Sequence, residues 1–270
     1  MLNLMYITKD PRVAAIADRA GVDRVFLDLE TVGKNLRQGG MNTVQSDHTP
    51  ADVAAVRPVL TKAELLVRVN PVYPGSKEEI ESVIGAGADV LMLPYFKSKA
   101  EAETFLSYVD GRAKTMLLFE TPEAVDHLDD ILSLPGDEYH IGLNDLHLGY
   151  GKRFMFQLLA DGTVETLCRA FAGTGQPYGF GGVAGVGTGA LPAELIIGEH
   201  VRLGSSRAIL ARSFCNTQLV TDYEEIEGIF QAGIPKIRAA EEQWKSCTVQ
   251  EREGNRLLVR KIVENIVERM

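Results

Sequence analysis

The sequence predicts an α/β protein that folds as a (β/α)8 TIM barrel with extra C-terminal helices. Strand-like and helix-like stretches alternate along the chain, which predicts a parallel sheet. The strand-like stretches are continuously apolar, as expected when both faces of a sheet are covered. A length of 270 residues is near the usual size of one such barrel. A doubly wound open sheet is the alternative, but its glycine fingerprint for dinucleotides is missing after the first strand.

Four strand–helix units are expected in the first half of the chain. The predicted strands are residues 2–7, 24–30, 64–70 and 89–94. The helices expected after them are residues 11–20, 49–60, 76–85 and 98–109. The second helix has a clear start signal, because Thr49 fits an N-cap and Pro50 a first-turn position.

The second half is expected to supply four further strands. These are residues 114–120, 139–145, 177–184 and 200–205. Helices are expected from residue 121 and over residues 154–171 and 191–198. The eight units together predict a closed barrel, with an active site at the carboxyl ends of the strands.

The chain after about residue 215 is predicted to be an addition to the barrel. This divides the protein into a barrel of residues 1–215 and a helical extension of residues 216–270. The extension is expected to contain a helix over residues 222–246, broken at 233–235, and a second helix over 256–270. The second helix carries an apolar stripe that needs a surface to cover it. We expect a neighbouring subunit to cover it, which predicts a homo-oligomer.

Charge and cysteine content limit the partners. A net charge of −9 argues against binding to nucleic acid or to an anionic membrane. The chain has no apolar run of the ~18 residues that cross a bilayer, and its start does not resemble a signal peptide. Cys168, Cys215 and Cys247 are scattered and odd in number, which indicates free thiols in a reducing cytoplasm.

Two carboxylates are expected at the ends of neighbouring strands. Glu120 closes the fifth predicted strand and Asp145 the sixth. Mg²⁺ is commonly held by one or two carboxylates, with water and substrate completing its shell, and Mn²⁺ or Co²⁺ accepts the same ligands. The pair therefore predicts a metal site that a 2-oxo acid can chelate; the alternative is two helix caps or buried ion pairs.

Further residues at this rim would hold the substrate. Arg68, at the end of the third strand, provides a planar cation for a keto oxygen or carboxylate. The backbone N–H groups of Leu143, Asn144 and Asp145 lead into the next helix and are expected to bind the substrate carboxylate. Glu30 is expected to support a metal-bound water or Arg68.

These residues belong to segments that resemble the HpcH/HpaI aldolase/citrate lyase β-subunit family over about residues 25–207. The matching segments are Leu27-Asp28-Leu29-Glu30, Arg68-Val69-Asn70, Gly87 to Pro94, Phe119 to Ala124 and Ile141 to Leu146. The resemblance implies a barrel with Mg²⁺ or a similar ion on Glu120 and Asp145. It also implies that Arg68 contacts a 2-oxo acid, and that the C-terminal helices form oligomers.

The chain departs from this family after the second strand. The pyruvate aldolases of the family have a histidine directly after the acidic residue of that strand, where this chain has Thr31. His147, close to Asp145, is a candidate to replace it as the catalytic acid or base. The alternative is a histidine bonded to a local carbonyl group.

Several other residues have two interpretations. His48 is expected to cap the following helix, or else to lie over the site. Lys34, Arg37, Lys152 and Arg153 could bind a phosphate or a coenzyme A tail, or could be solvated loop charges. The glycine-rich residues 179–189 would bind phosphate or form an open loop.

The combined prediction is a divalent-metal-dependent carbon–carbon lyase, acting on a 2-oxo acid through a pyruvate or oxaloacetate enolate. One alternative is a citrate-lyase-like enzyme that takes an acyl-coenzyme A thioester, which Lys34 and Arg37 favour. Another is a catalytically silent barrel that binds a metabolite.

Overall fold

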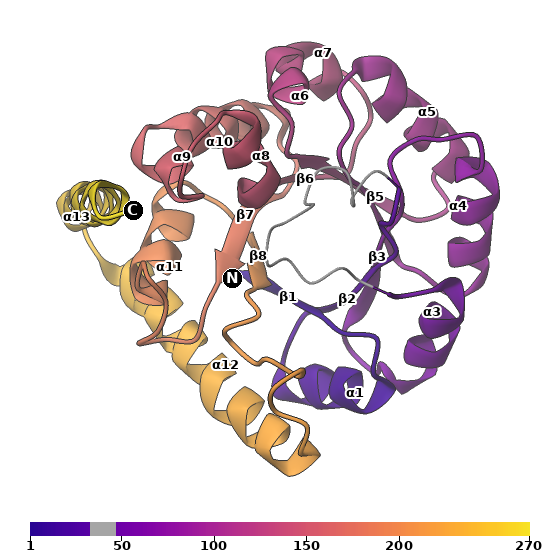
Figure 1. Cartoon of the computed structure of the whole chain (residues 1–270), viewed down its shortest axis with the longest axis horizontal. Helices are drawn as coiled ribbons and strands as arrows, with labels where there is room; N and C mark the ends of the chain where they lie inside the picture. The colour runs from indigo at the N-terminus through magenta and orange to yellow at the C-terminus, as the bar shows by residue number, and fades with distance from the viewer. Residues whose placement is uncertain (33–46) are drawn as a thin grey trace.

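The computed structural model of the chain describes residues 1–32 and 47–270. Eight parallel strands form a closed barrel in which each strand pairs with the next and β8 pairs with β1 (Figure 1). The strands are β1 (Asn3–Ile7), β2 (Arg24–Asp28), β3 (Glu64–Arg68), β4 (Val90–Leu93), β5 (Lys114–Phe119), β6 (Glu138–Ile141), β7 (Tyr178–Val183) and β8 (Arg207–Leu210). The predicted fold class is therefore confirmed.

Helices surround the barrel in chain order. Those between β1 and β5 are α1 (Pro11–Ala20), α3 (Pro50–Val56), the 3-10 helix η1 (Arg57–Val59), α4 (Ser76–Gly85) and α5 (Lys99–Val109). Those after β5 are α6 (Pro122–Asp126), α7 (Leu128–Leu132), α8 (Leu143–Gly149), α9 (Gln157–Ala160), α10 (Thr163–Thr174), α11 (Ala193–Arg202), α12 (Tyr223–Ser246) and α13 (Val249–Glu268). None of the helices in the described residues combines the length and apolar character that crossing a bilayer requires.

Local sequence signals set the ends of α1. The side chain of Asp10 accepts hydrogen bonds from the backbone N–H groups of Arg12 and Val13, and Pro11 occupies the first turn. Gly21 ends the helix with a left-handed φ of 92°, a conformation that costs glycine little. The chain can therefore turn directly into β2.

The barrel interior is layered. Its middle is apolar and consists of Met5, Phe26, Leu66, Val90, Met92, Met116 and Leu118. Below it, at the amino ends of the strands, Arg24 donates to Glu138 at 2.6 Å and 2.7 Å, and Arg207 donates to Glu138 at 2.8 Å. Burial would raise the pKa of Glu138, but the two arginines lower it to about 2. The structural ion cluster thus lies at the opposite end of the barrel from the carboxyl ends of the strands.

The eighth strand was predicted in the wrong place. Residues 200–205 are not a strand, because His200 lies in α11 and stacks on Phe180, while β8 is Arg207–Leu210. Arg207 consequently starts the strand at the amino end of the barrel and does not reach the rim. The end of the sixth strand was also predicted too late: β6 ends at Ile141, and Asp145 lies in the first turn of α8.

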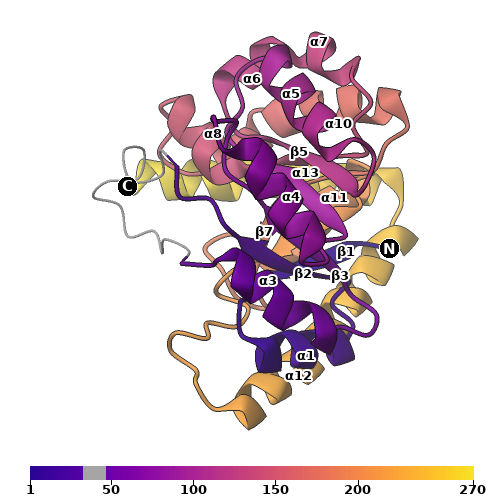
Figure 2. The ribbon, with the colours of Figure 1, turned by 90° about the vertical axis from the view of Figure 1, so that its right-hand side faces the viewer.

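The C-terminal helices differ in their roles. α12 packs against α1 and α11 and completes the ring of helices, whereas α13 lies outside the ring against α9 and α11 (Figures 1 and 2). The predicted break at 233–235 is wrong, because α12 continues through Pro235, and the ring of Phe214 packs where a side chain at Gly233 would lie. The division at residue 215 stays a prediction.

Candidate functional site

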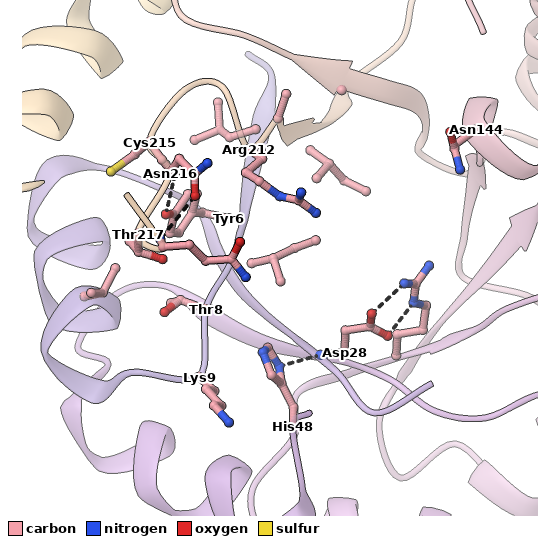
Figure 3. Close-up of a pocket in the computed structure, with 18 of the residues that line it drawn as sticks. Tyr6, Thr8, Lys9, Asp28, His48, Asn144, Arg212, Cys215, Asn216 and Thr217 are labelled. Atoms are coloured by element: carbon pink, nitrogen blue, oxygen red, sulfur yellow. Dashed lines mark hydrogen bonds and ion pairs between the residues drawn. The ribbon is translucent and has the colours of Figure 1, made fainter. Parts of the chain in front are cut away.

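A cavity of about 1090 Å³ opens at the carboxyl ends of the strands (Figure 3). Five of the residues predicted for the site line it: Arg68, Glu120, Leu143, Asn144 and Asp145. They come from β3, the end of β5 and the first turn of α8. The structure therefore brings together the predicted metal-binding and substrate-binding residues.

Arg68 is held in a fixed orientation by two carboxylates. Its Nε and Nη2 atoms donate to Asp28 at 2.8 Å and 2.7 Å, and Nη2 lies 3.5 Å from Glu30 Oε2. Burial alone would lower the pKa of Arg68, but Asp28, Glu30 and Glu120 raise it. Arg68 is a permanent cation with little freedom to rotate.

Glu120 is a buried carboxylate in an acidic setting. The backbone N–H of Tyr95 donates to its Oε1 atom at 2.9 Å. Burial raises the pKa of Glu120 to about 8; Arg68 opposes this shift, while Asp145 and Glu30 add to it. Tyr95 has a left-handed φ of 47°, which is uncommon for a residue with a side chain and often found at functional sites.

The chain after β6 passes very close to Glu120. The N–H of Gly142 donates to the carbonyl of Phe119 at 3.0 Å, and α8 begins at the next residue. A Cβ atom at Gly142 would lie 2.6 Å from Glu120 Oε2. The absence of a side chain at Gly142 therefore lets the first turn of α8, with Asp145, approach the Glu120 carboxylate.

The donor set suits a hard divalent cation. In the described residues, no group of three or more His, Cys, Asp and Glu side chains is arranged to hold a metal. Two protein carboxylates are enough for a site of this kind, because water and substrate supply the other ligands of the ion. The surroundings of Glu120 indicate that a cation fits here. Burial raises the pKa of Glu120, and the negative charges of Asp145 and Glu30 raise it further. A bound cation would relieve the repulsion among these carboxylates.

Two predicted residues do not line the cavity. Glu30 is buried behind it, beside Arg68. His147 is also buried, and its Nδ1 atom lies 3.1 Å from the carbonyl oxygen of Leu143 in its own helix. The structure therefore does not bring His147 together with the other candidates.

His48 lines the cavity and does not cap a helix. Thr49 and Asp52 form the capping box of α3, whereas His48 Nδ1 accepts the N–H of Asp28 at 3.0 Å. Burial is the main cause that lowers the pKa of His48. Since Nδ1 accepts, the neutral ring carries its proton on Nε2.

The other residues considered for phosphate or coenzyme A binding lie in different places. Lys152 forms an ion pair with Asp161 at 2.6 Å. Gly181 and Gly182 of β7 line the cavity. Lys34 and Arg37 lie outside the described residues.

Sequence reasoning missed three contributors. Asp28 lies in the segment Leu27-Asp28-Leu29-Glu30 that carries the family resemblance, but no role was predicted for it. The backbone donor of Tyr95 has no sequence signature. Arg212 follows the end of β8 by two residues and lines the cavity. The rule that carboxyl ends of barrel strands carry function would have found it, had β8 been predicted correctly.

Comparison with known proteins agrees with the barrel fold. The model of the HpcH/HpaI aldolase/citrate lyase family matches residues 3–153. An HpcH/HpaI aldolase/citrate lyase family protein from Burkholderia cenocepacia J2315 has a similar structure, with a TM-score of 0.60 and 16% identity over 83% of this chain and 94% of that one. The citrate synthase SbnG is similar with a TM-score of 0.58 and 15% identity, over 88% of this chain and 94% of that one. Comparison with curated proteins finds no match.

Proposed function

The family model covers more than half of the 270 residues, so the chain belongs to the HpcH/HpaI aldolase/citrate lyase family, and we propose that it is a divalent-metal-dependent carbon–carbon lyase acting on a 2-oxo acid. Family membership supports a lyase or condensing enzyme of the aldolase/citrate lyase kind. The observation that carries the finer proposal is the buried Glu120, whose pKa is raised by burial and by its acidic neighbours Asp145 and Glu30 and lowered by the cation Arg68.

In this proposal Glu120 and Asp145 would hold Mg²⁺, Mn²⁺ or Co²⁺. Such an ion, when bound, would supply Lewis-acid stabilisation of negative charge on the substrate. Arg68, fixed by Asp28 and Glu30, would orient the carboxylate or keto oxygen of the oxo acid. Leu143, Asn144 and Asp145 line the same cavity and are the candidates to bind the substrate carboxylate through their N–H groups.

The proposed reaction is an aldol addition and its reverse. In the synthetic direction a proton leaves C3 of pyruvate, C3 of the enolate bonds to an aldehyde carbon, and the aldehyde oxygen takes up a proton. Cleavage reverses these changes and returns both carbonyl compounds. The low-dielectric surroundings of Arg68 strengthen its interaction with the developing negative charge.

Proton exchange tests the first half of this reaction without knowledge of the second substrate. Pyruvate is incubated with the protein in D₂O, with each metal and then with EDTA, and its methyl ¹H signal is followed. Metal-dependent loss of the signal is expected in the wild type and not in Glu120→Ala. Exchange on acetyl-coenzyme A alone would favour the thioester alternative, and no exchange with any metal would favour the silent barrel.

We also propose that the protein is a homo-oligomer. Val259 and Val263 of the predicted stripe are buried against the chain's own helices, but Leu257 and Leu258 of α13 stay 53% and 45% exposed. A neighbouring subunit would cover these two leucines.

A further inference from the structure

Arg212 is a cation at the rim of the cavity that the predicted mechanism does not use. It follows the last residue of β8 by two positions, and its side chain extends over the cavity (Figure 3). Within residues 1–32 and 47–270 it forms neither a hydrogen bond nor an ion pair, and it is exposed to solvent. A guanidinium group in this state is available to an anion that enters the cavity.

The other cations in the described part of the cavity wall are already paired with carboxylates. Arg68 is bonded to Asp28, and Lys9 forms an ion pair with Asp47 at 2.6 Å. Of the described lysines and arginines in the wall, Arg212 is thus the one whose charge has no carboxylate against it. An anion would gain more from Arg212 than from Lys9.

A second donor lines the same cavity. His48 Nδ1 accepts the N–H of Asp28, so its Nε2–H group is the remaining donor of the neutral ring. His48 and Arg212 both line the cavity, one before α3 and the other after β8. Together they offer a cation and a neutral donor, a combination that suits a carboxylate or phosphate.

Arg212 is set apart from Arg68 around the barrel, whereas His48 lies between them, hydrogen-bonded to Asp28. Two strands, β1 and β2, lie between β8 and Arg68 on β3. A cavity of about 1090 Å³ is slightly larger than the usual small-molecule site, which leaves room for two reactants. The oxo acid would occupy the side of Arg68 and Glu120, and its partner the side of Arg212.

We propose that Arg212 and His48 bind an oxyanion carried by the second reactant, so that the enzyme selects carbonyl acceptors with a carboxylate or phosphate end. The inference rests on the proposed function for its catalytic meaning, because an acceptor exists only if the oxo acid forms an enolate. Binding of the oxyanion itself does not depend on the reaction.

The test compares three aldehydes of equal chain length that end in carboxylate, phosphate monoester or hydroxyl. Condensation with pyruvate is measured as kcat/KM for the wild type, Arg212→Ala, Arg212→Lys and His48→Ala. The wild type is expected to prefer one of the two anionic aldehydes over the hydroxyl form by about 10-fold or more. Arg212→Ala is expected to bring this ratio close to one, with Arg212→Lys intermediate, and the preferred anion identifies the group.

Two controls separate the possible failures. Arg169→Ala, an exposed arginine on α10, should leave the ratio unchanged. Calorimetric titration with inorganic phosphate and with succinate measures oxyanion binding without any reaction.

The outcomes distinguish the two proposals. If the wild type exchanges no protons but binds phosphate or succinate through Arg212, the proposed function fails and the oxyanion site stands. An unchanged selectivity ratio in Arg212→Ala, or equal loss for all three aldehydes, overturns the inference. Equal oxyanion binding by the wild type and Arg212→Ala overturns it as well.

Discussion

Two hydrogen bonds join Arg68 to Asp28, from Nε to Oδ1 at 2.8 Å and from Nη2 to Oδ2 at 2.7 Å. The two residues are register partners on the paired strands β2 and β3. The barrel backbone thus sets the position of both groups before any substrate arrives. Such preorganisation is how a fixed charge contributes to catalysis without reorganising during the reaction.

Asp28→Asn should therefore impair substrate orientation more than folding. We expect kcat/KM for pyruvate exchange to fall about 10- to 100-fold, because the neutral amide has one acceptor oxygen and its NH₂ group cannot accept the second Arg68 bond. The free energy of unfolding should fall by about 1–3 kcal/mol, since Glu30 stays near Arg68. Exchange kinetics and urea denaturation measure the two effects. Asp129→Asn, an exposed change on α7, is the matched control, and equal kinetics in the two variants would contradict the role of Asp28.

Removing either predicted metal ligand should abolish metal-dependent stabilisation. Saturating Mn²⁺ at about 100 times Kd should stabilise the wild type by about 2.7 kcal/mol, visible as a rise in Tm. Glu120→Gln and Asp145→Asn should show little or no rise, because each loses one of the two carboxylates.

Glu123→Gln is the control for this experiment. Glu123 follows Glu120 by three residues, but it is exposed and its carboxylate accepts a hydrogen bond from Lys97. Its Tm response to Mn²⁺ should equal that of the wild type. A normal response in Glu120→Gln would place the ion elsewhere.

The loss of stability at acidic pH should depend on Glu138. Its pKa in the folded protein is about 2, below the ordinary glutamate value of 4.5, because Arg24 and Arg207 outweigh the effect of burial. A depressed carboxyl pKa stabilises the fold above the unfolded pKa and loses this contribution as the pH falls from about 4.5 through 2. The contribution at neutral pH is roughly 3 kcal/mol.

Glu138→Gln tests this directly. The variant should be less stable than the wild type at pH 7, and its unfolding free energy should change less between pH 5 and pH 2. Urea denaturation across that range gives both values. Parallel pH curves for the two proteins would show that Glu138 is not responsible.

Gly142→Ala should damage the site because of one methyl group. The new Cβ atom would lie 2.6 Å from Glu120 Oε2 and 2.7 Å from Glu120 Cβ, so Glu120 or α8 must move. We expect the exchange rate to fall at least about 10-fold, since small misplacements of catalytic groups are costly. Gly173→Ala is the control: it lies in α10 with nothing within 4 Å, and should stabilise the protein by about 0.5–1 kcal/mol. Wild-type exchange in Gly142→Ala would contradict the close approach.

The sequence was most informative where strand and helix patterns are unambiguous. The helices at residues 11–20 and 76–85 match α1 and α4 to the residue, because an N-cap at Asp10 and clear helical periodicity define them. The site residues at the ends of β3 and β5 followed from the barrel rule. Asp145 was identified even though it lies in a helix, because β6 and α8 are joined by Gly142 alone.

Long-range packing explains the errors. His200 is buried in the last turns of α11 and stacks on Phe180 of β7, and the short run that follows the predicted helix 191–198 does not by its pattern distinguish the end of a buried helix from a strand. The error displaced the eighth strand and so hid Arg212. The role of His48 depends on a hydrogen bond to Asp28, a partner 20 residues away that no local pattern indicates.

The exposed leucines of α13 lead to the last prediction. Leu258 is 45% exposed, whereas Val259 and Val263 beside it are buried, so the apolar stripe of the helix is only partly covered by its own chain. We expect the wild type to sediment as an oligomer at micromolar concentration and Leu258→Glu to shift it toward the monomer, because a charge cannot be buried unpaired at an interface. Val249→Glu is the matched control: Val249 is 78% exposed on the same helix and, at about 3.6 residues per turn, faces the opposite side. A monomeric wild type would contradict the proposed assembly, and dissociation by Val249→Glu alone would assign the interface to the other face of α13.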